Sequence, residues 1–360
     1  MKNDNDAYRM DSHKLLFHPR EVARWLANGE VYPIYLEISP SGTCNHRCTL
    51  CALDYLGYKP RFLDTAILLE RLTELVGLGV KSIMYGGEGE PLLHPDIATI
   101  VNHTKRVGLD VAITTNGTRL TAGLVEEIAA SVSWIRVSLN GGTAATYAAL
   151  HRTDPADFDL VLNNIATAAA LLRRTGVSSC ILGVQMVLLP KNTAEAATLA
   201  ALVKEAGARY LVIKPYSQHP KSLNRHYAQV DYTDWPAIRE ELASLAAEDF
   251  SIVIRENALR RTCEQERGYG RCLALPFWSY IDAAGDVWGG SSYLGNHDFR
   301  YGNIAENRFQ DIWQGAQRRQ LMQRAATELD PADCRLNCRM DAVNHYLWEL
   351  THPGAHVNFI

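Results

Sequence analysis

Short apolar segments alternate with amphipathic helical segments between residues 31 and 214. In the first helical segment, Leu68, Leu72 and Leu75 recur at helical spacing and predict one apolar face. The predicted strands are 31–38, 82–85, 111–114, 134–138, 181–189 and 210–214, and the predicted helices between them are 64–78, 95–107, 124–130, 158–174 and 194–206. Repeats with such short connections indicate an α/β fold with a parallel sheet and helical crossovers. The pattern suits a partial (β/α)6 TIM-like barrel, and it describes an open doubly wound sheet equally well.

The regular alternation stops after Pro215, and residues 217–235 are polar and irregular. The further predicted elements are an early helix at 19–28, a helix at 236–247, a strand at 251–255, a hairpin with Gly285 in its turn, a helix at 309–324 and a short C-terminal helix. The chain therefore divides into four predicted segments: a lead-in at 1–31, the barrel at 32–216, a linker with a helix and a strand at 217–258, and a C-terminal module at 259–360.

Composition narrows the class of protein. The chain has 360 residues, of which 47% are hydrophobic and 21% are charged, as expected for one large domain with an appendage, or for two domains. A net charge of -4 does not indicate a protein that binds the phosphates of a nucleic acid. No apolar run is long enough to cross a bilayer, and the polar, acidic start is unlike a signal peptide. We therefore predict a cytoplasmic protein without a nucleic-acid or membrane partner.

Eight cysteines call for an explanation in such a chain. In a reducing compartment, clustered cysteines mark metal or redox chemistry more often than disulfides. The first group is Cys44, Cys48 and Cys51, and the second is Cys263, Cys272, Cys334 and Cys338. Cys180 stands alone and is predicted to be a small buried core residue.

The first cysteine group packs three thiols into eight positions directly after the first predicted strand. Functional residues of parallel β/α folds lie on loops at the carboxyl ends of strands, so this loop should lie at the barrel mouth. Three thiolates can hold three irons of a cubane cluster and leave the fourth iron open, whereas four thiolates are usual for electron transfer. The alternative is a zinc site with His46 as a fourth ligand.

The spacing of Cys44, Cys48 and Cys51, C-x3-C-x2-C, resembles the signature of the radical S-adenosylmethionine (SAM) enzymes. The resemblance implies a [4Fe-4S] cluster whose open iron binds the amino and carboxylate groups of SAM. It also implies that one electron, from a flavodoxin- or ferredoxin-type donor, cleaves SAM to a 5'-deoxyadenosyl radical. That radical would abstract a hydrogen atom from the substrate, with the cofactors carrying the chemistry.

The second predicted strand runs into a stretch, 85–91, that resembles the Gly-Gly-Glu-Pro motif of the same family. The motif holds the SAM amino group, and Gly87 and Gly89 would let the backbone approach a ligand closely. Glu90 is the predicted contact, and Glu88, which stands where a glycine is usual, is the alternative.

Further candidates lie at the ends of the later predicted strands. The resemblance places polar groups from the fourth strand against SAM, which suggests Ser138 and Asn140, although ordinary turn chemistry explains both residues equally well. Asn140 stands where an acidic residue is common in the family. The remaining candidates at the same mouth are Asn116, Gln185 and Lys214, the last two as contacts of SAM or of the substrate.

The second cysteine group, with its aromatic hairpin, resembles the SPASM and twitch extensions that bind auxiliary iron–sulfur clusters. The position where such an extension usually has its second cysteine is Gly290. The remaining cysteines suffice for one auxiliary [4Fe-4S] cluster. Cys263 could complete a four-thiolate site with Cys272, Cys334 and Cys338. If Cys263 is free, an open three-thiolate cluster could bind substrate, and a structural zinc site is the further alternative.

The resemblance therefore predicts a radical SAM oxidoreductase that acts on a polar small molecule, such as a sugar, aminocyclitol or sugar nucleotide. The reaction would be a dehydrogenation or an epimerisation. The first alternative is a maturase of ribosomal peptides. Many of those carry a winged-helix module before the barrel, and about thirty residues before the first strand are too few for one. The second alternative is a zinc-stapled binding protein without catalysis.

Overall fold

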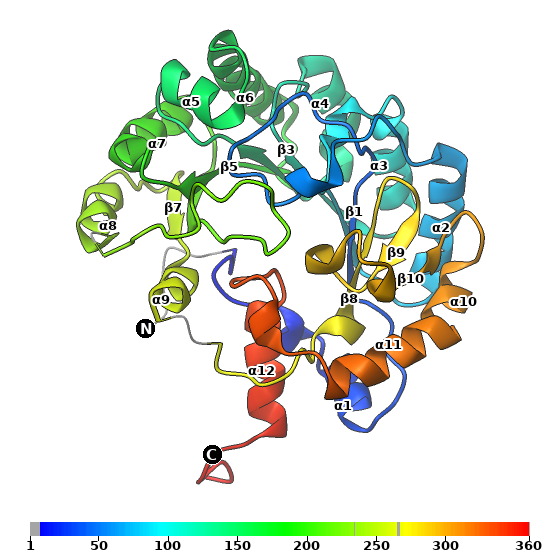
Figure 1. Ribbon diagram of the computed structural model, residues 1–360. Coiled ribbons are helices and arrows are strands. Elements are labelled where there is room, and N and C mark those ends of the chain that lie inside the picture. The colour runs from blue at the N-terminus through cyan, green and yellow to red at the C-terminus, as the bar shows by residue number, and fades with distance from the viewer. Residues whose placement is uncertain (1–7, 234, 265–266, 360) are drawn as a thin grey trace.

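The computed structural model describes residues 8–233, 235–264 and 267–359, and the described strands form one sheet. The strands are β1 (Tyr35–Ile38), β2 (Ser82–Tyr85), β3 (Asp110–Thr115), β4 (Trp134–Ser138), β5 (Ile181–Leu188), β6 (Tyr210–Pro215), β7 (Ser251–Ile254), β8 (Trp278–Ile281), β9 (Asp286–Trp288) and β10 (Arg300–Asn303). Their order is β10-β9-β8-β1-β2-β3-β4-β5-β6-β7. Strands β1 to β7 run parallel, whereas β9 pairs antiparallel with both β8 and β10. The sheet curves into an open barrel (Figure 1).

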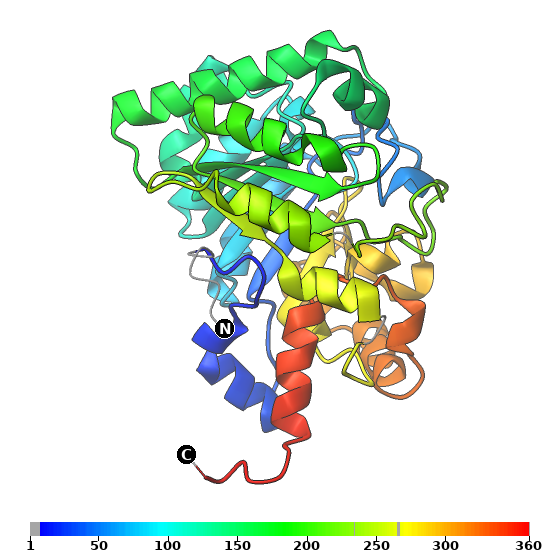
Figure 2. The same cartoon turned by 90° about the vertical axis from the view of Figure 1, so that its left-hand side faces the viewer.

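Helices cover the outer face of the sheet, as Figures 1 and 2 show from two sides. The helices of the described residues are α1 (Pro19–Leu26), α2 (Thr65–Gly77), α3 (Ile97–Arg106), α4 (Ala122–Ile128), α5 (Ala144–His151), α6 (Ala156–Thr175), α7 (Ala196–Glu205), α8 (Trp235–Ala243), α9 (Glu256–Glu264), α10 (Phe309–Trp313), α11 (Ala316–Thr327) and α12 (Asp341–Thr351), of which α1, α9 and α12 lie toward the open side of the barrel (Figure 1). The predicted partial barrel with its C-terminal extension is confirmed. Among the described residues, no helix combines the length and apolarity that crossing a membrane requires.

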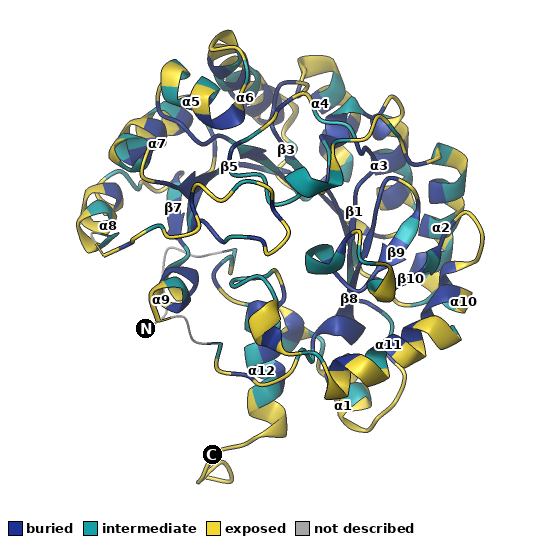
Figure 3. Ribbon diagram, viewed as in Figure 1, coloured by how far each residue is buried: buried dark blue, intermediate teal, exposed yellow. Residues whose placement is uncertain are grey.

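The two faces of the parallel sheet differ in chemistry. On the outer face, Leu36 and Ile83 are fully buried and belong to the same core as Leu72 of α2. On the inner face, side chains such as Arg136 and Gln185 are half-buried. Figure 3 shows the sheet buried beneath helices whose outer surfaces are exposed. Because an inner face that only filled a barrel would be apolar, these polar side chains indicate a space for a ligand.

The structure departs from the predicted elements in several places, and it contains a helix, α9, and a strand, β10, that the sequence did not predict. The predicted helix at 309–324 is two helices, α10 and α11, with Gly315 at the junction. Helix α5 was not predicted, although Thr143 caps it by accepting a hydrogen bond from the Thr146 N–H. The strand β7 of the predicted linker pairs with β6, and β8 of the predicted C-terminal module pairs in parallel with β1. Both later segments therefore extend the barrel sheet.

Candidate active site

A cavity of about 630 Å³ opens at the inner face of the sheet. Its walls come from the cysteine loop after β1, the carboxyl ends of the strands, the N-terminal segment and the loop before α12. Predicted site residues that line it are Cys44, Cys48, Cys51, Gly87, Gly89, Glu90, Asn116, Ser138, Asn140, Gln185, Lys214 and Cys338. One space therefore brings together residues from both cysteine groups.

The thiols of the first group are half-buried and electrostatically coupled. Burial raises the pKa of Cys44 to about 11, and burial and the neighbouring thiols raise that of Cys48 well above its usual value. The pKa of Cys51 is also raised, chiefly by burial. Such thiols become thiolates only when a cation compensates them. The backbone N–H of His46 donates to the Cys44 sulfur at 3.4 Å, so this donor set suits a metal cluster.

Two imidazoles flank Cys48. Its Sγ lies 3.5 Å from Nδ1 of His151, and donor atoms of His46, Cys48 and His151 lie within 4.8 Å of one another. Burial lowers the pKa of both imidazoles, to about 3 for His151, so both are neutral at pH 7. The sequence pointed to His46 but not to His151, which lies on the unpredicted helix α5.

The cysteine loop is tied to the end of β3 by side-chain amides. Asn116 donates from Nδ2 to Oδ1 of Asn45 at 2.7 Å, and Asn45 donates from Nδ2 to Oγ1 of Thr118 at 2.9 Å. Oδ1 of Asn116 accepts from the backbone N–H of Thr118. Asn116 therefore lines the cavity while its side chain orients the loop.

The glycine-rich loop after β2 packs directly on the cysteine loop. A Cβ on Gly89 would lie 2.3 Å from the carbonyl oxygens of Ser41 and Thr43, so only glycine fits there. The next residue, Glu90, donates its N–H to the Thr43 oxygen at 2.8 Å. At Gly87, φ is +107° and a Cβ would meet the Tyr280 hydroxyl at 2.0 Å.

The Glu90 carboxylate is 2% exposed and accepts several hydrogen bonds from the protein. Oε1 accepts from Oγ1 of Thr115 at 2.6 Å and from the Leu92 N–H at 3.0 Å, and Oε2 accepts from the Asn116 N–H at 2.7 Å. Burial raises its pKa to about 7 despite these donors. A carboxylate offers about four acceptor sites, so one is left for a ligand in the cavity.

Glu88 points elsewhere. Its Oε1 accepts from the Ala283 N–H at 3.1 Å and from Nη2 of Arg61 at 3.3 Å, so it joins the loop to the β8–β9 hairpin. Glu88 does not belong to the cavity wall, whereas Glu90 does. Of the two predicted contacts for the SAM amino group, the geometry favours Glu90.

The strand-end candidates fall into two kinds. Ser138 and Gln185 are register neighbours on β4 and β5, and their side chains, like that of Lys214, form no hydrogen bond with another residue in the described part of the chain. Asn140 instead accepts from the Val187 N–H at 2.8 Å, and its Nδ2 lies 3.2 Å from Nε2 of His151. The first three are therefore free to meet a ligand, whereas Asn140 holds the scaffold together.

Three members of the second cysteine group lie close together. Burial and then the Cys334 thiol raise the pKa of Cys272 to about 11, and burial followed by Cys334 and Cys272 raises that of Cys338. The N–H of Met340 donates to the Cys338 sulfur at 3.3 Å. Cys263 is exposed on α9. This helix contacts the loop between Cys334 and Cys338, because Asn337 of that loop donates a hydrogen bond to Oγ1 of Thr262 at 2.8 Å. Cys272, Cys334 and Cys338 could therefore share a cluster.

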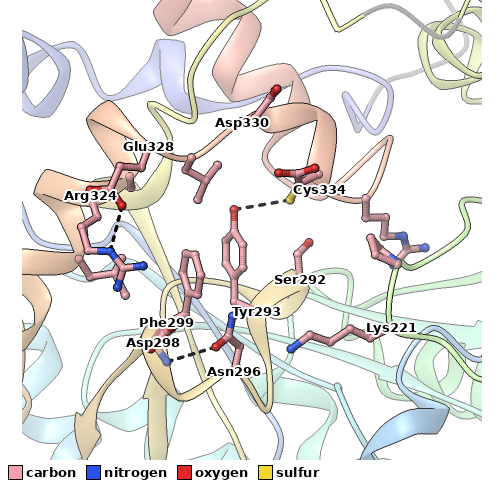
Figure 4. Close-up of a pocket in the computed structure, with 16 residues that line it drawn as sticks. Lys221, Ser292, Tyr293, Asn296, Asp298, Phe299, Arg324, Glu328, Asp330 and Cys334 are labelled. Atoms are coloured by element: carbon pink, nitrogen blue, oxygen red, sulfur yellow. Dashed lines mark hydrogen bonds and ion pairs between the residues drawn. The ribbon is translucent and has the colours of Figure 1, made fainter.

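A second cavity, of about 330 Å³, borders Cys334 (Figure 4). The Cys334 thiol donates a hydrogen bond to the Tyr293 hydroxyl at 3.6 Å, and the Tyr293 ring stacks on Phe299. At Gly290 a Cβ would lie 2.7 Å from the Trp278 ring. A cysteine at position 290 would therefore clash with Trp278 in this packing.

Two family models match the chain. The model described as the radical SAM superfamily covers residues 38–203, and the model described as an iron–sulfur cluster-binding SPASM domain covers residues 272–339. The chain belongs to the radical SAM superfamily, with a C-terminal SPASM domain. The predicted cofactors, a SAM-binding [4Fe-4S] cluster, SAM and an auxiliary iron–sulfur cluster, are confirmed at the level of these two families.

Curated relatives of this radical SAM protein have several activities. It is 26% identical to the mycofactocin maturase MftC of Mycobacterium tuberculosis over 79% of this chain and 71% of that one. It is 26% identical to an AdoMet-dependent heme synthase of Methanosarcina barkeri, over 76% and 80% respectively. A GTP 3',8-cyclase of Chlorobaculum tepidum is 29% identical, and there the chain spans 51% of its own length and 55% of the cyclase.

Solved structures share the fold. Streptococcus suis SuiB bound to the precursor peptide SuiA superposes with a TM-score of 0.64 at 18% identity, over 84% of this chain and 69% of that chain. The structure of anSMEcpe with bound AdoMet gives a TM-score of 0.58 at 16% identity, over 87% and 88%. At these identities the likeness concerns the fold alone.

Sequence reasoning missed the cationic side of the radical SAM cavity. Arg136 lies on β4, two residues before Ser138 and so on the same face, which is a signal that could have found it. Arg335 and Arg339 each follow a cysteine of the second group directly and also line the cavity. Their proximity to the barrel could not be read from the sequence, because it depends on how the C-terminal segment folds back.

Proposed function

We propose that this radical SAM enzyme abstracts a hydrogen atom from a peptide that enters the cavity between its two cysteine groups. The observation that carries the proposal is that one cavity is lined by Cys44, Cys48 and Cys51 and also by Cys338. The similarity to a named maturase extends over 79% of the chain, which is more than the barrel segment alone. This support favours the peptide over the small molecule that the sequence suggested as the main substrate.

Within this proposal, Cys44, Cys48 and Cys51 hold the first cluster. When bound, that cluster and SAM supply a 5'-deoxyadenosyl radical, and the auxiliary cluster supplies an acceptor for one electron. Glu90 offers its remaining acceptor site to the SAM amino group, and Ser138 offers a free hydroxyl. Gln185 and Lys214 are free to contact SAM or the substrate.

Other residues hold these groups in position. Gly87 and Gly89 allow the close approach of the loops, and Asn116 and Asn140 orient them through the hydrogen bonds described above. Glu88 joins the same loop to the hairpin. Such support fixes a reactive geometry without touching the reacting atoms.

For the auxiliary cluster we propose the thiolates of Cys272, Cys334 and Cys338, with Cys263 at the fourth position. The first three are near enough to influence one another electrostatically, whereas Cys263 is exposed on α9 and would have to turn inward. A flavodoxin- or ferredoxin-type protein is the proposed electron donor.

A second candidate substrate is a small anionic molecule such as a sugar nucleotide. Two observations favour it: the cationic side chains of the cavity wall, and the similarity of 51% of the chain to a GTP 3',8-cyclase. Dehydrogenation or epimerisation would then be the reaction.

The test uses anaerobically reconstituted protein with SAM, dithionite and candidate substrates in deuterated solvent. Synthetic candidate peptides form one arm, and sugar nucleotides form the other. We expect a peptide to raise the yield of 5'-deoxyadenosine and to change mass, by gain of deuterium for epimerisation or loss of two hydrogens for dehydrogenation. Turnover of a sugar nucleotide instead would favour the second candidate.

The matched controls are two cysteine variants. Cys48→Ala should abolish SAM cleavage, whereas Cys180→Ala removes a buried thiol outside both groups and should preserve it. A colourless protein that binds zinc and never cleaves SAM would overturn the proposal and favour a zinc-stapled binding protein.

A further inference from the structure

The cavity wall carries an excess of positive charge. Arginine and lysine side chains outnumber aspartate and glutamate there by seven to two. Three of the cations come from the later strands: Arg136 lies on β4, Lys214 on β6, and Arg255 directly after β7. Arg335 and Arg339 face them from the loop before α12. A cavity lined by one sign of charge attracts ligands of the opposite sign.

Some of these charges already have a counter-ion. Nε of Arg339 lies 2.8 Å from Oε2 of Glu37, and Nε of Arg255 lies 3.8 Å from Oδ1 of Asp11. Arg335 lies in the field of the Cys51 and Cys338 thiols, which would become thiolates around iron. These three cations are therefore balanced by the protein or by its clusters.

Arg136 and Lys214 are not balanced in this way. Nε of Arg136 donates to the Tyr210 hydroxyl at 3.4 Å, and its guanidinium lies 4.5 Å from the centre of the Trp134 ring, so its contacts are neutral. In the described part of the chain, Lys214 has neither a hydrogen bond nor an ion pair. Burial and then the guanidinium groups of Arg335, Arg255, Arg136 and Arg339 lower the pKa of Lys214. A cation in this setting is costly unless an occupant of the cavity brings negative charge.

SAM does not bring that charge. The family resemblance places its carboxylate on the open iron of the first cluster, and its sulfonium leaves the molecule with a net positive charge. We infer that the substrate itself carries an anionic group, a carboxylate or a phosphate, that binds between Lys214 and Arg136 on the inner face of the sheet. This inference rests on the proposed function, since it concerns the substrate of the same cavity. The anion would orient the reacting carbon toward the SAM side of the cavity.

The experiment is an anaerobic calorimetric titration of the SAM-loaded holoenzyme. The probes are inorganic pyrophosphate for a phosphate group, triglutamate for the carboxylates of an acidic peptide, and triglutamine as the neutral control. We expect one anionic probe to bind saturably and triglutamine not to bind. Stronger binding of pyrophosphate indicates a phosphorylated small molecule, and stronger binding of triglutamate indicates an acidic peptide.

The variants locate the binding. Lys214→Met and Arg136→Met should each weaken the better probe at least tenfold, whereas Lys214→Arg should stay within about threefold because it keeps the charge. Lys191→Met removes an exposed lysine outside the cavity and should change nothing. Because this inference assigns Lys214 to the substrate rather than to SAM, the affinity for SAM should be the same in all of these proteins.

Three results would overturn the inference: no binding of either anion, equal binding by wild type and both methionine variants, or a Lys214→Met protein that loses SAM affinity rather than anion affinity. Each is distinguishable from failure of the proposed function. That failure would appear as absent reductive cleavage of SAM, which is measured separately from anion binding.

Discussion

Replacing Gly89 with alanine would place a methyl carbon 2.3 Å from the carbonyl oxygens of both Ser41 and Thr43. Non-bonded heavy atoms need roughly 3.5 Å, so one of the two loops would have to move by about 1 Å. Both obstacles are backbone atoms, which cannot rotate away as a side chain would. The movement would separate the Glu90 N–H from the Thr43 oxygen and displace the loop that carries Cys44.

The magnitude follows from two contributions. Overpacking at a tightly packed site typically costs about 1–3 kcal/mol, and loss of one buried backbone hydrogen bond costs about 1 kcal/mol. We therefore expect Gly89→Ala to lower the free energy of unfolding by about 2–4 kcal/mol. Reconstitution should also yield less iron per chain, because the three thiols of the first group would no longer face one space.

Anaerobic urea denaturation measures the first effect, and iron analysis after reconstitution measures the second. Gly123→Ala in α4 is the matched control, because a Cβ there meets no atom within 4 Å and alanine favours a helix. That control should be neutral or slightly stabilising. Unchanged stability together with full iron loading in Gly89→Ala would refute the steric argument.

Three further predictions concern the same cavity. Burial raises the pKa of Glu90 to about 7 from an ordinary 4.5, so between these pH values the folded apoprotein binds more protons than the unfolded chain. The free energy of unfolding should therefore fall as the pH rises from 5 to 7, by at most about 3 kcal/mol. Urea denaturation at several pH values should show a smaller dependence on pH in Glu90→Gln than in the wild type. Cys263→Ala and Cys272→Ala should each remove about four irons per chain, and one electron paramagnetic resonance signal of the reduced protein should disappear. Full iron content in Cys263→Ala would exclude Cys263 as a ligand. Asn45→Ala breaks two hydrogen bonds, to Asn116 and to Thr118, so the unfolding free energy should fall by about 1–3 kcal/mol, and an unchanged urea midpoint would contradict a role for Asn45 in holding the cysteine loop.

The barrel could be predicted because its signals are local. Each strand from β1 to β6 is a short apolar run, and the apolar face of α2 repeats at helical spacing. Helix α5 is short and rich in alanine, so its buried residues Tyr147, Leu150 and His151 do not stand out as an apolar face, and the sequence missed it. Gly315 divides the predicted helix at 309–324, and because the residues on both sides favour a helix, the break was also missed.

The candidate site was partly readable for a similar reason. Cys44, Cys48, Cys51 and Glu90 stand in local motifs, and the structure brings them to one cavity. The hydrogen bonds of the Asn140 side chain could not be predicted from the sequence, because its partners Val187 and His151 approach it only through tertiary packing. The pairing of β8 with β1 likewise joins segments about 240 residues apart, for which local propensity carries no information.

The same long-range pairing bears on function. Because β8 adds to β1, the segment that follows it returns across the open side of the barrel and places Arg335 and Arg339 in the cavity wall. Each arginine directly follows a cysteine of the second group, so iron bound at Cys334 and Cys338 would also fix where those arginines stand. Loss of the auxiliary cluster should therefore change the charge that a substrate meets, as well as removing an electron acceptor. Substrate affinity and auxiliary cluster content should then fall together in Cys272→Ala, even though Cys272 does not line the main cavity.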